Sequence, residues 1–172
     1  MRIHEVDRHH GVPYIVSEFI AGRTLADLLS ERRLGFRESA TLIAEVAEAL
    51  EYAHQQHVVH RDIKPSNILL DESLRPYVTD FGLARRDDLE ITITVEGQVL
   101  GTPAYMSPEQ AAGEQQRVDR RSDVYSLGVV LYHAISGSLP FRGSRRMLVR
   151  QVLHDEPLPP RRINDEVPRD LE

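Results

Sequence analysis

The chain has 172 residues, of which 41% are hydrophobic, so it is long enough to form one domain or a large part of one. Its net charge is −6, and the 21 basic and 27 acidic residues are mixed along the sequence, which argues against a nucleic-acid or anionic-membrane surface. There is no cysteine, which excludes disulfides and thiolate metal sites and fits a reducing cytosol. The apolar runs are too short to span a bilayer, so we expect a cytoplasmic location, no membrane segment in this chain and no nucleic-acid partner.

The first 20 residues are predicted to form a β-hairpin. Two segments rich in β-branched residues, 3–6 and 13–20, flank the polar turn DRHHG, which ends in a glycine. Gly22 is expected to end the second strand, and TLADLLSER then predicts a short amphipathic helix. The clearest helical pattern covers residues 38–57, where apolar side chains recur every three or four positions.

The second half of the chain alternates between short strands, one long loop and helices. Short strands are predicted around 58–59, 68–70 and 77–79. Residues 83–107 carry few helix or strand signals apart from ITITV, which indicates a long functional loop. A buried helix ended by Gly137 is expected over 123–136, and a weaker helix over about 144–154.

The stretch HRDIKPSNILL, from His60 to Leu70, concentrates the chemistry-bearing residues. It places an acid, Asp62, a cation, Lys64, and an amide, Asn67, at offsets of two and three before an apolar triplet. Lys64 is the only lysine in the chain, whereas all other basic residues are arginine. This choice indicates that the position requires a compact ammonium group and not a planar guanidinium.

Four motifs follow one another at a characteristic spacing: HRDIKPSN at 60–67, DFG at 80–82, GTPAYMSPEQ at 101–110 and DVYSLGVVLY at 123–132. On these motifs the chain resembles a eukaryotic-type serine/threonine protein kinase, of the kind also common in bacteria. The resemblance implies an α+β, protein-kinase-like fold with a mainly α-helical C-lobe and a remnant N-lobe β-hairpin. Residues 1–20 would then be the remnant of the small lobe, and 21–172 a large lobe that is incomplete at its C-terminus.

The resemblance also implies roles for the residues of the catalytic loop. Asp62 would orient the acceptor hydroxyl, Lys64 would stabilise charge on the transferring phosphoryl group, and Asn67 and Asp80 would share Mg²⁺. The D-x-K-x-x-N form resembles the serine/threonine class rather than the tyrosine class. Thr102 fits the same class, since its hydroxyl would bridge Asp62 and Lys64.

Further roles concern the ATP site and the structural support of the loop. YIVSEFIAG at 14–22 resembles the segment between the lobes, in which the backbone of Glu18 and Ile20 would bind adenine and Leu69 would lie under the base. Leu69 would serve equally as ordinary strand packing. The structural roles fall on the motif residues His60, Phe81, Gly82, Glu109 and Asp123. Asp123 would brace the backbone of the catalytic loop, and the arginine partner of Glu109 is expected beyond Glu172.

Arg61, just before Asp62, marks the kinase type that is switched by loop phosphorylation. Thr92 and Thr94 are the candidate sites, although both equally fit a plain β-forming role in ITITV. His54, His57 and His60 are spaced by three, but no carboxylate or cysteine completes a metal site at suitable spacing, so we expect structural roles for them.

Two hypotheses about function follow, because the chain contains no G-x-G-x-x-G and no V-A-x-K motif. In the first, the protein is an enzyme that uses ATP and Mg²⁺ to transfer the γ-phosphate to Ser/Thr hydroxyls of protein substrates. In the second, the chain is a catalytically inactive kinase fragment that acts as a binding or regulatory module. The apolar surface exposed around Ile3 predicts poor solubility or a partner. Self-association or a partner kinase for trans-phosphorylation is the candidate interaction beside the protein substrates.

Overall fold

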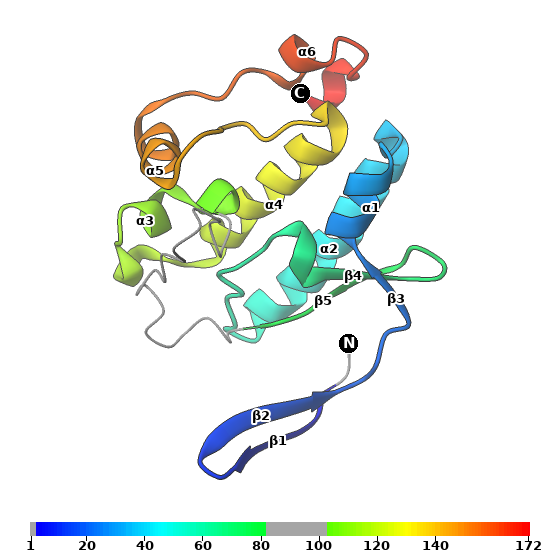
Figure 1. Ribbon diagram of the computed structural model, residues 1–172, viewed down its shortest axis with the longest axis vertical. Helices are drawn as coiled ribbons and strands as arrows, with labels where there is room; N and C mark the ends of the chain where they lie inside the picture. The colour runs from blue at the N-terminus through cyan, green and yellow to red at the C-terminus, as the bar shows by residue number, and fades with distance from the viewer. Residues whose placement is uncertain (1–2, 82–102) are drawn as a thin grey trace.

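The structure is a computed structural model that describes residues 3–81 and 103–172 (Figure 1). Its helices are α1 (Leu25–Glu31), α2 (Phe36–Gln55), α3 (Pro108–Ala111), α4 (Arg120–Ser136), α5 (Arg145–His154) and α6 (Pro160–Ile163). Its strands are β1 (Ile3–His9), β2 (Val12–Ser17), β3 (Gly22–Thr24), β4 (Ile68–Asp71) and β5 (Pro76–Val78). The expected α+β class, mainly helical with a small hairpin, is therefore confirmed.

The predicted N-terminal hairpin is present, but its turn is shorter than the sequence indicated. β1 and β2 pair in antiparallel register, and the last pair joins His9 to Val12. His10 and Gly11 form the whole turn with φ values of 50° and 82°, as a tight two-residue hairpin turn requires. β1 therefore continues three residues beyond the predicted end at Val6. The hairpin lies apart from the helices, at the bottom of Figure 1.

A second, antiparallel sheet has the strand order β3-β4-β5. β3 was not predicted, because Gly22 was interpreted as a strand breaker. Gly22 in fact pairs with Asp71, and a Cβ atom at position 22 would lie 1.9 Å from the carbonyl oxygen of Leu70. The glycine thus permits the close approach of the two strands, a common reason for glycine within a sheet.

The strand predicted at 58–59 is wrong, because these residues form no strand and follow directly after the end of α2. The backbone N–H of Val58 donates to the carbonyl of Ala53 at 3.0 Å, and His57 has a left-handed φ of 60°. This hydrogen bond across the last helical turn satisfies a carbonyl that the helix itself leaves free. The segment therefore leads directly from α2 into the loop that contains Asp62.

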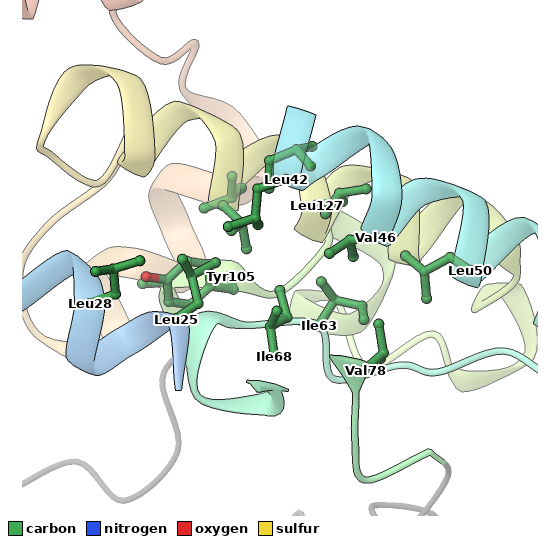
Figure 2. Packing of buried hydrophobic residues seen from close by; sticks show 14 of the residues in the cluster. Leu25, Leu28, Leu42, Val46, Leu50, Ile63, Ile68, Val78, Tyr105 and Leu127 are labelled. Atoms are coloured by element: carbon green, nitrogen blue, oxygen red, sulfur yellow. The ribbon is translucent and has the colours of Figure 1, made fainter. Parts of the chain in front are cut away.

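The core lies between α2, α4 and the β3-β4-β5 sheet, as Figure 2 shows. α2 contributes the apolar stripe that its sequence predicted, and α4 adds Leu127. Burying each such side chain contributes about 1.5–3 kcal/mol to folding. α4 ends at Gly137 with φ 72°, as predicted, but begins three residues before Asp123 because Asp119 caps its first turn. The shared core residues include Leu42, Val46, Leu50, Ile63, Ile68, Val78 and Leu127.

α1 covers one side of the segment 65–67. Thr24 and Asp27 form a reciprocal capping box, in which the Thr24 hydroxyl accepts from the Asp27 N–H at 3.1 Å. The Asp27 carboxylate accepts from the Thr24 N–H at 3.0 Å in return. Leu25 and Leu28 are completely buried, so the helix is held against the core by one face. Of the helices in the described ranges, none has the length and apolar character needed to cross a membrane.

Candidate active site

The loop between α2 and β4 brings three predicted site residues together. The Oδ2 atom of Asp62 accepts hydrogen bonds from Lys64 Nζ at 2.6 Å and from Asn67 Nδ2 at 3.0 Å. Asn67 Nδ2 also donates to the backbone carbonyl of Asp62 at 2.9 Å. The Asp62 side chain remains 39% exposed, so the carboxylate is oriented by two donors and is still accessible to a ligand.

His60 fixes the beginning of this loop from within the core. It is fully buried, its Nε2 lies 2.7 Å from the carbonyl oxygen of Thr79, and its Nδ1 accepts from the Asp62 N–H at 3.2 Å. These two contacts require the tautomer that carries its proton on Nε2. The ring also packs on Phe81, with centroids 4.7 Å apart. The imidazole therefore connects the Asp62 backbone to the segment that precedes Asp80.

Asp123, at the start of α4, holds the same loop from the opposite side. Its carboxylate is completely buried and accepts from the backbone N–H groups of His60 and Arg61 at 2.9 and 2.7 Å. His54 Nε2, from the last turn of α2, lies 2.7 Å from the same carboxylate. A buried carboxylate is stable only with such partners. Sequence reasoning did not pair His54 with Asp123, because no pattern connects positions that far apart.

The backbone of Arg61 adopts a strained conformation between these anchors. Its φ is 71°, in the left-handed region that side-chain-bearing residues rarely occupy. Asp123 accepts its N–H, and Gln110 Nε2 donates to its carbonyl at 2.6 Å, so both sides of the residue are fixed. Among the described residues, none forms an ion pair with the Arg61 guanidinium.

Asn67 and Asp80 lie at the same end of the β4–β5 pair. The N–H of Thr79 donates to the carbonyl of Asn67 at 2.9 Å, and Asp80 is the next residue, exposed and with φ 62°. Asn67 uses its Nδ2 atom to bind Asp62, and its Oδ1 atom accepts a long hydrogen bond from the Ser66 hydroxyl at 3.5 Å, so this oxygen keeps a lone pair for a metal ion. An amide oxygen and a carboxylate suit the oxygen preference of Mg²⁺, so these residues fit the metal that the sequence implied.

The histidines that were considered as a metal cluster make separate contacts in the structure. His54 binds Asp123 and His60 binds Thr79. In residues 3–81 and 103–172, no group of three or more histidines, cysteines or carboxylates is arranged to hold a metal ion.

The residues predicted to bind adenine lie on neighbouring segments. Glu18 and Ile20 belong to the connection between β2 and β3, where Glu18 is exposed and Ile20 is half-buried. Leu69 is half-buried in β4, the central strand, where it pairs with Thr24 of β3. The 18–21 connection directly precedes β3, and β3 pairs with β4, the strand that carries Leu69.

Four predicted residues lie outside the described residues: Gly82, Thr92, Thr94 and Thr102. Glu109 lies within them and accepts a hydrogen bond from the Ser122 hydroxyl of α4. Burial of Glu109 opposes ionisation, but the hydrogen bonds from Ser122 and neighbouring groups outweigh it and lower the pKa of the carboxyl. The described contact of Glu109 is thus Ser122, and the arginine partner expected beyond Glu172 stays a prediction.

One further pair, Tyr105 and His133, was not singled out from the sequence. The two side chains meet with the Tyr105 oxygen 2.9 Å from His133 Nδ1. They line a cavity of about 340 Å³ whose wall also includes Lys64. The cavity therefore adjoins Asp62, to which Lys64 is bound.

Comparison with known proteins shows the family in which these residues occur. The protein kinase domain family model matches residues 1–169. The serine/threonine-protein kinase PknB of Mycolicibacterium smegmatis is 41% identical over 164 residues, which cover 94% of this chain and 26% of that protein. A probable serine/threonine-protein kinase of Clostridium perfringens is 39% identical over 169 residues, 97% of this chain and 24% of its own. The PknB of Mycobacterium tuberculosis is 40% identical over 164 residues, again 94% and 26%. The chain thus spans about a quarter of the length of these curated relatives.

Proposed function

This chain belongs to the protein kinase domain family, and from that premise we propose that it carries the catalytic loop of a serine/threonine protein kinase. The reaction is transfer of the γ-phosphoryl group of ATP to Ser or Thr hydroxyls of protein substrates. The observation that carries the proposal is the convergence of Lys64 Nζ and Asn67 Nδ2 on one oxygen of Asp62. Phosphoryl transfer depends on such positioning and charge more than on covalent chemistry.

Asp62 receives the proton of the acceptor hydroxyl as the hydroxyl oxygen forms its bond to the γ-phosphorus. The bond between that phosphorus and the bridging oxygen of ADP breaks in the same step, so ADP is the leaving group. The Lys64 ammonium, 2.6 Å from Asp62, is positioned to stabilise negative charge on the phosphoryl group. The lysine also fits the serine/threonine class, which Thr102 would support.

Protein kinases generally use ATP with Mg²⁺, and this chain belongs to that family. We assign Mg²⁺ to Asn67 and Asp80, where the ion would neutralise charge on the phosphates. The backbone of Glu18 and Ile20 would bind adenine, with Leu69 beneath the base.

Regulation would act through Arg61, whose guanidinium would bind a phosphate on Thr92 or Thr94. Phosphorylation by a second copy or by a partner kinase follows from this hypothesis. In the same proposal residues 1–20 belong to the small lobe and 21–172 to the large lobe. The need for ATP and the absence of cysteine support a cytoplasmic location.

A second candidate function is that of a non-catalytic module that binds substrates or a partner kinase. It is favoured by the fact that Lys64 is the only lysine in the chain, so these 172 residues provide no second ammonium group for the phosphates.

A phosphotransfer assay separates the two functions. The protein, expressed from its complete reading frame, is incubated with Mg·ATP labelled on the γ-phosphate and with peptides that contain Ser, Thr or Tyr as the only acceptor. The first function predicts label on Ser and Thr peptides and none on Tyr peptides. Absence of label together with binding of the same peptides would establish the second function instead.

A further inference from the structure

The peptide group between Arg61 and Asp62 is held by a hydrogen bond at each end. Its N–H, from Asp62, donates to His60 Nδ1 at 3.2 Å. Its carbonyl, from Arg61, accepts from Gln110 Nε2 at 2.6 Å. His60 belongs to the same loop, whereas Gln110 lies 49 residues after Arg61, in α3. The Gln110 contact is therefore the one that joins this peptide group to another part of the fold.

The side chain of Gln110 uses its two polar atoms in opposite directions. Its Oε1 accepts from the backbone N–H and from the hydroxyl of Ser107, both at 3.1 Å, as in a capping box at the start of α3. Its Nε2 then faces the Arg61 carbonyl, which can only accept. Glutamate is the other residue common at this capping position, but a carboxylate would turn an oxygen toward the carbonyl. Of these two residues, only glutamine satisfies both ends.

Packing alone does not fix this peptide group. A cavity of about 40 Å³ lies against it, with Arg61, Asp62, Gln110 and Ser126 among its lining residues. A void supplies no contacts that resist rotation of the neighbouring peptide group. In addition, Arg61 has a left-handed φ of 71°, a conformation that persists only where the surroundings fix it. Loss of the Gln110 hydrogen bond would thus leave the peptide group free to rotate and to relieve this strain.

We propose that Gln110 is a positioning residue, which makes the orientation of the Asp62 carboxylate depend on the placement of α3. Asp62 directly follows the peptide group, so rotation of this group moves its carboxylate away from Lys64 and Asn67. A displaced α3 would withdraw the Gln110 amide and disorganise the site without contacting a reacting group. The proposal rests on the serine/threonine kinase function and adds a regulatory contact to that site.

The first measurement is phosphotransfer by Gln110→Glu, in the protein expressed from its complete reading frame. The glutamate keeps the acceptor for Ser107, so α3 retains its cap, but the hydrogen bond to the Arg61 carbonyl is lost. With a Ser peptide and labelled Mg·ATP, we expect kcat to fall about tenfold while KM for the peptide stays unchanged. Gln116→Glu, the same charge change at an exposed position, should alter neither constant. Equal kcat values for Gln110→Glu and wild type would contradict the positioning role.

Hydrogen exchange followed by mass spectrometry gives a readout that does not depend on activity. The Asp62 amide is bound to His60 Nδ1, and rotation of the peptide group would break this bond and speed its exchange. We expect a fragment covering 58–64 to exchange faster in Gln110→Glu than in the wild type, and a fragment covering 41–50 of α2 to be unchanged. Equal exchange of 58–64 in the two proteins would overturn the proposal. Faster exchange of both fragments would indicate a general loss of stability and would overturn it too.

Gln110→Met separates the lost hydrogen bond from the added charge. Methionine has a similar size, adds no charge near Asp62 and cannot donate to the Arg61 carbonyl. It should therefore also raise the exchange of 58–64 and lower kcat. Wild-type values in Gln110→Met would assign the effect of Gln110→Glu to its charge and would contradict the proposal.

The two measurements allow the two hypotheses to fail separately. A wild type that transfers no label, together with faster exchange of 58–64 in Gln110→Glu, would contradict the kinase function while supporting the control of the loop by Gln110. A wild type that transfers label, together with unchanged exchange in Gln110→Glu, would support the kinase function and contradict the positioning role.

Discussion

The carboxylate of Asp123 accepts the backbone N–H of His60 at 2.9 Å, although the two residues are 63 positions apart in the sequence. The hydrogen bond joins the buried start of α4 to the loop that presents Asp62. With its second contact, to the Arg61 N–H, it holds two successive N–H groups of the catalytic loop, the second of them on the left-handed residue Arg61. The position of Asp62 therefore depends on a residue that cannot itself reach the substrate.

Replacing Asp62 with Asn should abolish most phosphotransfer while leaving the fold intact. The amide cannot accept the proton of the acceptor hydroxyl, so we expect kcat to fall by about 10²–10⁴-fold. Labelled Mg·ATP and a Ser peptide measure the loss, and Asp165→Asn, at an exposed position of the C-terminal segment, serves as the control. Retention of full activity in Asp62→Asn would contradict the role given to this carboxylate.

Replacing Lys64 with Arg should lower kcat even though the charge is kept. The compact ammonium lies 2.6 Å from Asp62, and the larger planar guanidinium cannot occupy the same position. We expect kcat to fall by about 10²-fold, the typical effect of losing one group that stabilises charge in the transition state. Arg146→Lys, at an exposed position of α5, tests whether an exchange between the two residue types is harmless elsewhere. Equal kcat values for the Lys64→Arg variant and the wild type would show that charge alone suffices.

Replacing Asp123 with Ala should destabilise the protein strongly. The substitution leaves two backbone N–H groups and His54 without their acceptor in a buried site. Loss of one member of such a buried network reduces the free energy of unfolding by about 3–5 kcal/mol. Urea denaturation followed by circular dichroism measures the change, and the exposed Asp170→Ala is the matched control. A change for Asp123→Ala no larger than that of the control would disprove the bracing role.

Gly22→Ala should destabilise the β3–β4 pair. The new methyl group would lie 1.9 Å from the carbonyl oxygen of Leu70, so the two strands must move apart. Overpacking of this kind reduces the free energy of unfolding by about 1–3 kcal/mol. Gly35→Ala provides the control, since a Cβ atom there meets no heavy atom within 4 Å. Similar denaturation midpoints for the two variants would mean that β3 is not closely paired.

The stability of the fold should depend on pH through His133. Because its folded pKa is lowered, the unfolded state binds the proton more readily, and stability present above pH 6.5 is lost as the pH falls toward the folded pKa. His133→Gln cannot titrate, so the difference in unfolding free energy between wild type and variant should decrease as the pH falls below 6.5. Urea denaturation at pH 7.5, 6.5 and 5.5 measures this difference. A difference that is constant across the three values would contradict the lowered pKa.

Sequence reasoning located the four longest helices, α1, α2, α4 and α5, and the chemistry of the loop because both are local, whereas it missed the short helices α3 and α6. The apolar stripe of α2 and the glycine that ends α4 are readable within a few turns, and both were predicted. Likewise, the offsets between Asp62, Lys64 and Asn67 already place an acid, a cation and an amide within one short loop. The structure joins these three by hydrogen bonds of 2.6–3.0 Å.

The sequence alone determined the order of the motifs and therefore the family, since each motif is a fixed arrangement of neighbouring residues. Only the tertiary structure decided that His54 meets Asp123, that Gly22 pairs within a sheet, and that Tyr105 and His133 line a cavity beside Lys64. The physical reason is that such contacts depend on how α1, α2, α4 and β4 pack together. Packing between distant elements leaves no periodic pattern in a single sequence, whereas a helix or a catalytic loop does.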